Sequence, residues 1–170
     1  MAGAYYEMTG IEGKRTSDVT NAPAGNTTQG GAAAAVFRHD YDMAAFTSKL
    51  ALPEILGQPV TLLGDYVHNT GAQDDNGGWM AGVSVGKVTE KLGSWNLFYH
   101  YKRLEPDATF GAITDSDFGT GGTNHQGHIL GASMGLNKYA SVGAKYLRTD
   151  EVEGAQAHND TFQADLQLKF

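Results

Sequence analysis

The strict alternation of polar and apolar side chains over residues 161–170 limits the folds open to this chain. One set is entirely apolar: Phe162, Ala164, Leu166, Leu168 and Phe170. The side chains between them are all polar. Because successive side chains of a β-strand point to opposite faces, the segment is predicted to be a two-faced strand. Such a strand fits a soluble sheet with one buried face, or a transmembrane barrel that exposes its apolar face to lipid.

Similar alternation elsewhere predicts eight strands and no helix. The strands are expected at residues 2–11, 41–52, 60–69, 79–88, 95–104, 127–136, 139–148 and 161–170. The connections between them are alternately long and short. If the last residue lies on the periplasmic side, every long loop lies outside and every short turn inside, as in outer-membrane barrels. A soluble meander has no reason to separate long and short connections in this way.

The two faces of these strands differ in chemistry. Aromatic residues of the face predicted to contact lipid form a candidate membrane girdle: Tyr6, Trp79, Trp95, Tyr99, Tyr101, Tyr146, Phe162 and Phe170. Charged residues of the other face are predicted to face the lumen: Glu7, Lys49, Asp65, His100, Lys102, Lys145, Asp165 and Lys169. A soluble core built from the second set would bury many charges.

The predicted fold is therefore all-β: an antiparallel, up-and-down transmembrane β-barrel with about eight strands. We expect one domain over residues 1–170, with long outer loops at about 12–40 and 105–126. A soluble ligand-binding β-barrel, with the faces reversed, is the alternative fold.

Composition excludes several classes of function. The net charge of −7 argues against nucleic acid as a partner, because phosphates attract basic surfaces. The chain has no cysteine, so disulfides and thiolate metal sites are excluded. No apolar run reaches the roughly 18 residues of a membrane-spanning helix. The first residues do not resemble a secretory signal, so we expect any exported form to be mature or a fragment.

Few residues could carry chemistry beyond binding. Asp107, Asp115 and Asp117, followed by glycines, form a weak candidate for a hard cation such as Ca²⁺. The spacing is not that of an EF-hand, and a solvated acidic turn or a loop folded into the lumen is the simpler explanation. His100 and Lys102 either bias the field of a lumen or pair with acids inside a filled barrel. No catalytic constellation is recognisable, so we expect no enzyme.

Five segments are distinctive: 59–69 (PVTLLGDYVHN), 78–82 (GWMAG), 95–101 (WNLFYHY), 104–108 (LEPDA) and 115–123 (DSDFGTGGT). With the terminal Phe170, they resemble the C-terminal part of the bacterial outer-membrane "putative porin" family. The resemblance covers most of the chain from about residue 40 onward. It implies a β-barrel channel in which this chain supplies about half of the strands, and it brings no catalytic residues.

The expected function is a porin-like channel of the bacterial outer membrane for passive diffusion of small solutes or ions. A small, filled eight-stranded barrel with a structural or adhesive role is the alternative, because eight strands enclose little free space. The soluble ligand-binding β-barrel is the third hypothesis. The expected partners are outer-membrane lipid and lipopolysaccharide, small solutes, and the barrel-assembly machinery acting through the strand that ends in Phe170. Assembly of several copies is left open.

Overall fold

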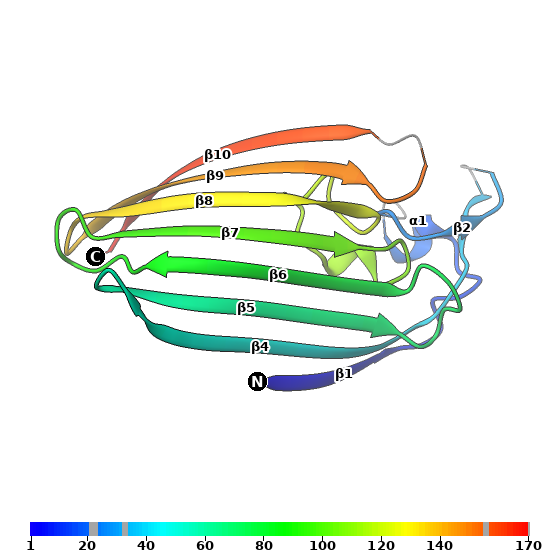
Figure 1. Cartoon of the computed structure of the whole chain (residues 1–170). Coiled ribbons are helices and arrows are strands. Elements are labelled where there is room, and N and C mark those ends of the chain that lie inside the picture. Colours follow the sequence, from blue (N-terminus) through cyan, green and yellow to red (C-terminus); the bar gives the residue numbers. More distant parts are fainter. Residues whose placement is uncertain (21–23, 32–33, 155–156, 170) are drawn as a thin grey trace.

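One antiparallel sheet forms the body of the computed structural model, which describes residues 1–20, 24–31, 34–154 and 157–169 (Figure 1). Its strand order is β1-β4-β5-β6-β7-β8-β9-β10. The strands are β1 (Ala2–Met8), β4 (Tyr41–Ile55), β5 (Gln58–Asn69), β6 (Gly77–Gly86), β7 (Trp95–Leu104), β8 (His125–Asn137), β9 (Ala140–Glu151) and β10 (His158–Leu168). Neighbours in the sheet are also consecutive strands of its meander, so the predicted up-and-down, all-β fold is confirmed.

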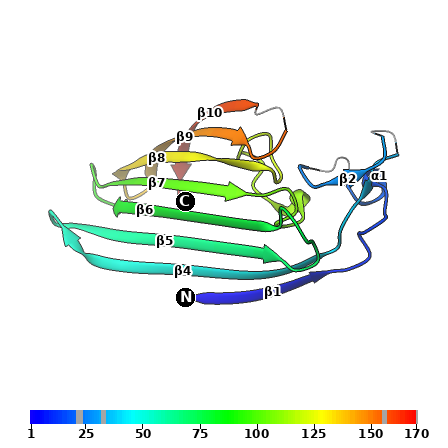
Figure 2. The same ribbon diagram turned by 45° about the vertical axis from the view of Figure 1, so that its right-hand side comes forward.

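The sheet is curled but not closed (Figure 2). Across the described residues, β1 and β10 form the two edges and no pairing joins them. β1 pairs only with the part of β4 from Tyr41 to Thr47. The predicted eight-stranded meander is therefore present as part of a barrel.

The two longest connections lie at the same end of the sheet. Connections β1–β4, β5–β6, β7–β8 and β9–β10 lie at the end we call the loop end, and β4–β5, β6–β7 and β8–β9 lie at the opposite turn end (Figure 1). The β6–β7 connection, residues 87–94, is longer than the β5–β6 connection, residues 70–76, so the predicted alternation of long and short connections holds only in part. The first long loop, predicted at 12–40, contains the short helix α1 (Thr16–Val19) and the small hairpin of β2 (Thr28–Gln29) and β3 (Val36–Phe37). The third contains the 3₁₀ turn η2 (Gly111–Ile113).

The β4–β5 hairpin is tighter than the sequence pattern indicated. A connection over residues 53–58 was expected, but β4 continues to Ile55 and β5 begins at Gln58. Leu56 and Gly57 between them have positive φ angles of 52° and 72°, which is the conformation of a two-residue hairpin turn. A register shift between Leu52 and Ile55 accommodates the extra length as a bulge.

The sheet has two faces, and only one of them is covered by the loop that follows β7. We call the face that carries Phe98, Ile129 and Leu147 the inner face, because Phe118 of the loop after β7 packs on it. The opposite, outer face exposes large apolar side chains, including Phe162 at 71% exposure. In a monomeric soluble protein such a continuous exposed apolar face would be unusual.

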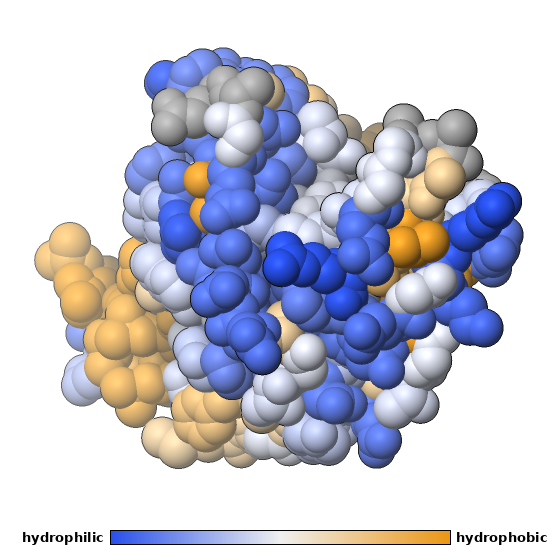
Figure 3. Space-filling model, turned by 90° about the vertical axis from the view of Figure 1, so that its right-hand side faces the viewer, coloured by the Kyte–Doolittle hydropathy of each residue, from blue (hydrophilic) through white to orange (hydrophobic). Residues whose placement is uncertain are grey.

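The compact packing lies at the loop end. One cluster joins Phe37, Tyr41, Met43 and Phe110, and a second joins Phe118, Ile129 and Leu147. Figure 3 looks onto this end and shows a mainly hydrophilic surface, with apolar atoms at its margin. Among the described residues, helices long and apolar enough to cross a membrane are absent.

Candidate functional site

A cavity of about 530 Å³ lies on the inner face, beside the loop that follows β7. Its charged lining residues are Asp65, His100, Lys102, Arg103, Asp115 and Lys145. Its apolar lining includes Val67, Met80, Phe98, Leu104 and Ile129. The cavity therefore combines an apolar floor with charges of both signs.

Strand register explains how the charged groups converge. Asp65 pairs with Met80, and Met80 pairs with Lys102, so the three residues form one row across β5, β6 and β7. Neighbouring strands are about 4.8 Å apart, which places the backbones of Asp65 and Lys102 about 10 Å apart. His100 lies two residues from Lys102 and so shares its face.

The loop of residues 105–124 is held against the inner face by Phe118. This ring is fully buried (0% exposed) among Ile129, Leu147 and Phe98. The ammonium Nζ of Lys102 lies 4.6 Å from the ring centroid, within the range of a cation–π contact. The loop therefore occupies part of the space that the curled sheet partly surrounds.

Two glycines make room for aromatic rings on the inner face. A Cβ atom on Gly82 would lie 2.1 Å from the ring of His100, and one on Gly131 would lie 2.3 Å from the ring of Phe98. In both cases the ring belongs to the residue paired with the glycine on the neighbouring strand. The small residues therefore accommodate aromatic side chains, which form part of the cavity wall.

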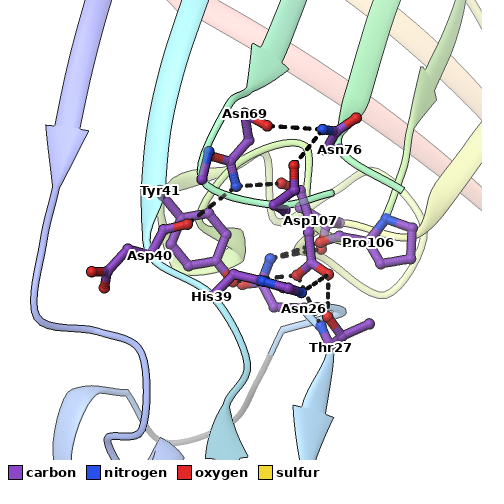
Figure 4. A network of polar contacts seen from close by, with 12 residues as sticks. Asn26, Thr27, His39, Asp40, Tyr41, Asn69, Asn76, Pro106 and Asp107 are labelled. Atoms are coloured by element: carbon purple, nitrogen blue, oxygen red, sulfur yellow. Dashed lines mark hydrogen bonds and ion pairs between the residues drawn. The ribbon is translucent and has the colours of Figure 1, made fainter. Parts of the chain in front are cut away.

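Asp107 joins three segments at the loop end (Figure 4). Its carboxylate, 1% exposed as a residue, accepts hydrogen bonds from the backbone N–H and the hydroxyl of Thr27. Tyr41 donates its hydroxyl to the same carboxylate at 3.4 Å, and His39 Nε2 lies 3.8 Å away. The backbone carbonyl of Asp107 accepts from Asn69 Nδ2 at 2.9 Å. A buried carboxylate with this many donors supports a fixed loop arrangement.

Asn26 makes a second connection between the same loops. Its Nδ2 donates to the carbonyls of Pro106 at 2.7 Å and Thr109 at 2.8 Å. Its Oδ1 accepts from the backbone N–H of Gly111 at 2.7 Å. One buried amide thus satisfies three backbone groups of the 105–124 loop, which has little regular structure of its own.

Two carboxylates outside the strands have shifted pKa values. The backbone N–H of Glu12 donates to Asp40 Oδ1 at 2.8 Å and is the main cause that lowers the pKa of Asp40. The charge of Asp75 is the main cause that raises the pKa of Glu153, and Glu105 adds to it. The second shift indicates that acids of three different loops influence one another at the loop end.

The structure does not assemble the candidate calcium ligands. Asp107 engages Thr27 and Tyr41, while Asp115 Oδ1 accepts the backbone N–H of Asp117 at 2.9 Å. Within the described ranges, groups of three or more His, Cys, Asp or Glu that could hold a metal ion are absent. The calcium hypothesis therefore gains no geometric support.

Most residues predicted to face the lumen lie on the inner face. Asp65, His100, Lys102 and Lys145 line the cavity described above. Lys49 lies in the same cross-strand row as His100, because Lys49 pairs with Leu63, Leu63 with Gly82, and Gly82 with His100.

Two further predicted lumen residues lie on β10 or just after it. Asp165 pairs with Gly143. Together with Lys145, Asp165 lines a second cavity of about 270 Å³. Lys169 follows β10 at the turn end, where its N–H donates to the Tyr139 carbonyl at 2.8 Å. Their lumen role stays a prediction.

β1 requires a correction, because its faces are the reverse of those predicted. Tyr6 pairs with Met43, which is buried at the loop end, so Tyr6 lies on the inner face. Glu7 pairs with Asp42 and lies on the outer face. Tyr5, not Tyr6, is the aromatic residue on the outer face of β1, although both side chains are exposed, at 63% and 53%. Two adjacent tyrosines fit either phase of the alternation, and only the pairing with β4 selects one.

The outer face carries the other predicted girdle residues that the structure describes: Trp79, Trp95, Tyr99, Tyr101, Tyr146 and Phe162. Phe170 lies outside the described residues. Phe46, Tyr66 and Tyr139 are also large, exposed aromatic side chains, and the sequence prediction omitted them from the girdle. Tyr66 could have been found, since it alternates in phase with Leu62. Contact of this face with lipid stays a prediction.

The two histidines at the entry to β8 lie on opposite faces, because residues three apart on a strand point in opposite directions. His125 is buried and contacts Phe118 edge to face, with ring centroids 6.4 Å apart. His128 lies on the outer face, where its Nδ1 is 2.7 Å from the hydroxyl of Tyr99. Phe118 itself was not singled out in the sequence. An aromatic residue amid aspartates and glycines is the signal that could have identified this anchor.

A model of a protein family described as "Putative porin" matches residues 32–170. The matched region contains β4 to β10 and every residue that lines the inner-face cavity. No curated protein matches the chain.

Proposed function

Because the chain belongs to the "putative porin" family, we propose that it forms part of a bacterial outer-membrane channel for passive diffusion of small solutes. The observation that carries this proposal is the division of the sheet into an apolar outer face and a charged inner face. A water-filled pore in lipid requires this division, whereas a soluble protein requires the reverse. Diffusion requires no catalytic group, and the family match points to a non-enzymatic protein.

The outer face has dimensions suited to a membrane. On β10, Phe162, Leu166 and Leu168 lie on the outer face along six residue steps, a length of about 20 Å. This length is comparable with the roughly 25 Å apolar band of outer-membrane barrels. We propose that the aromatic residues around this band contact lipid and lipopolysaccharide.

The inner face supplies the features of a selective passage. The cavity places Lys102 and Lys145 beside Asp65 and Asp115, so a permeating ion would meet charges of both signs. Phe118 holds the 105–124 loop on this face, which reduces the cross-section available to a solute. Electrostatic bias and width are the two properties by which such pores discriminate.

The two open edges of the sheet require hydrogen-bonding partners in lipid. Unpaired edge groups cost several kcal/mol each in lipid, so the edges β1 and β10 must be paired in a membrane. β1 runs toward the loop end and β10 runs away from it, so an even number of added antiparallel strands completes the cylinder. We propose that such strands, from further chain or another copy, enlarge the enclosed space.

Single-channel recording tests the proposed function. The protein is refolded in detergent, inserted into planar bilayers and recorded in an asymmetric salt gradient. Steady conductance steps are expected, and Lys145→Glu should shift the reversal potential toward cation preference. Glu7→Gln on the outer face is the matched control and should not shift it. Insertion without any conductance would contradict the channel function of this chain.

A further inference from the structure

Charge is distributed unevenly along the axis of the sheet. At the loop end, Glu12, Asp74, Asp75 and Asp107 line an outward-facing cavity of about 470 Å³, together with Arg38 and His39. Acidic residues outnumber basic ones in this lining. The loop end therefore presents negative charge to an approaching solute.

Further acids reinforce this negative mouth. Glu153 is held beside the start of β8, since its N–H donates to Asn124 Oδ1 at 2.9 Å and its carbonyl accepts from Asn124 Nδ2 at 3.0 Å. The charge of Asp75 raises the pKa of Glu153, and Glu105 contributes in the same direction. Arg103 lies 3.3 Å from Glu105 and offsets part of its charge. The carboxylates of separate loops therefore form one shared field.

The other half of the sheet is basic. Lys49 and Lys145 lie on the inner face, and Lys87, Lys91, Lys138 and Lys169 lie at or near the turn end. The acids of this half are Glu54, Glu90 and Asp165, so basic residues outnumber acidic ones. Between the two halves, Asp65 and Lys102 balance one another within a single row.

The acidic zone at the loop end and the basic zone of the other half are far enough apart to act on a solute separately. Lys145 and the end of β9 at Glu151 are six residues apart, a distance of about 20 Å along the strand. Electrostatic screening at physiological ionic strength extends about 8 Å. A solute that crosses the pore therefore meets the acidic zone and the basic zone one after the other.

We propose that this axial separation of charge makes the channel selective for small zwitterionic solutes, such as free amino acids, over ions of either sign. A cation is attracted at the acidic mouth and repelled by the lysines, and an anion meets the opposite order. A zwitterion can turn its ammonium group to the acids and its carboxylate to the lysines, so neither zone excludes it. The inference rests on the proposed channel function and specifies its substrate class.

The test compares four probes of similar size in vesicles that contain the refolded protein at low ionic strength. The probes are alanine (zwitterion), lactate (anion), alaninol (cation) and glycerol (neutral). Alanine is expected to enter several-fold faster than lactate and alaninol. At about 1 M salt, where screening extends only about 3 Å, the difference should disappear.

Charge variants assign the effect to the two zones. Asp75→Asn with Glu153→Gln should accelerate lactate, and Lys49→Gln with Lys145→Gln should accelerate alaninol. Asp75 has a positive φ of 51°, a conformation that asparagine tolerates, so its replacement should preserve the loop. Glu7→Gln on the outer face is the matched control and should leave all four rates unchanged.

The outcomes separate this inference from the proposed function. If no probe enters, including glycerol, the channel function itself is contradicted. If glycerol enters but alanine is no faster than lactate or alaninol, only the zwitterion selectivity is overturned. The current–voltage curve is an independent measurement. Opposite charge at the two ends predicts an asymmetric curve at low salt, and a symmetric curve would also overturn the zwitterion selectivity.

Discussion

Replacement of Phe118 by alanine should release the 105–124 loop from the inner face. The ring is fully buried against Ile129 and Leu147 and also contacts the Lys102 ammonium. Loss of a buried phenylalanine side chain costs about 3–5 kcal/mol. Of this, the cation–π contact accounts for about 0.5–2 kcal/mol.

The loss should act locally, because the hydrogen-bonded ladder of the sheet does not depend on this ring. Since 1.4 kcal/mol corresponds to a tenfold change in an equilibrium, the fraction of molecules with a detached loop should rise on the order of 100-fold or more. Limited proteolysis of the refolded protein measures this fraction through the rate of cleavage within residues 105–124. A channel formed by Phe118→Ala should also conduct more, because the loop then leaves the inner face.

Ile113→Ala provides the control within the same loop. Ile113 is 60% exposed, so its truncation should change stability by no more than about 0.5 kcal/mol. Equal cleavage rates for Phe118→Ala and the unmodified protein would refute the role of Phe118 as the anchor. Equal acceleration by both variants would show that the loop responds to any truncation.

Three further predictions concern the loop end and the inner face. Asn26→Asp should destabilise the loop end by about 2–4 kcal/mol, seen as faster proteolysis, because a carboxylate cannot donate to the two carbonyls that Asn26 satisfies. Gly82→Ala should cost about 1–3 kcal/mol in urea unfolding, because its Cβ would collide with the His100 ring; an unchanged midpoint would contradict this packing. The lowered pKa of Asp40 stabilises the fold above the ordinary aspartate pKa, and this stabilisation is lost as pH falls through the lower folded-state pKa. Asp40→Asn should therefore flatten the acid limb of the unfolding profile between about pH 2 and 5, while an unchanged limb would exclude Asp40 as its source.

Much of the sheet could be predicted from local alternation. Over residues 95–104 the predicted strand coincides with β7, because apolar and polar side chains largely alternate along this segment (WNLFYHYKRL). The charged lining of the cavity was also predictable, since Asp65, Lys102 and Lys145 all occupy the polar phase of their strands. These features depend on a period of two residues, which the linear sequence records directly.

The pairing of strands and the packing of loops were not accessible in the same way. Which residues of β1 face inward depends on its pairing with β4. The adjacent Tyr5 and Tyr6 do not indicate locally which of them faces outward. The contacts of Asn26 with the 105–124 loop and of Phe118 with Leu147 join residues far apart in the chain. Such contacts arise from long-range geometry, which no local pattern encodes.

The sequence by itself therefore determined the all-β meander, the positions of the two longest loops, and the chemistry of the two faces of most strands. These properties follow from the two-residue period of a strand and from residue type. Only the tertiary structure decided that the sheet stays open along β1 and β10 within the described residues, and that Phe118 anchors a loop on the inner face. Register, curvature and loop packing decide these features, because they depend on how distant segments meet in space.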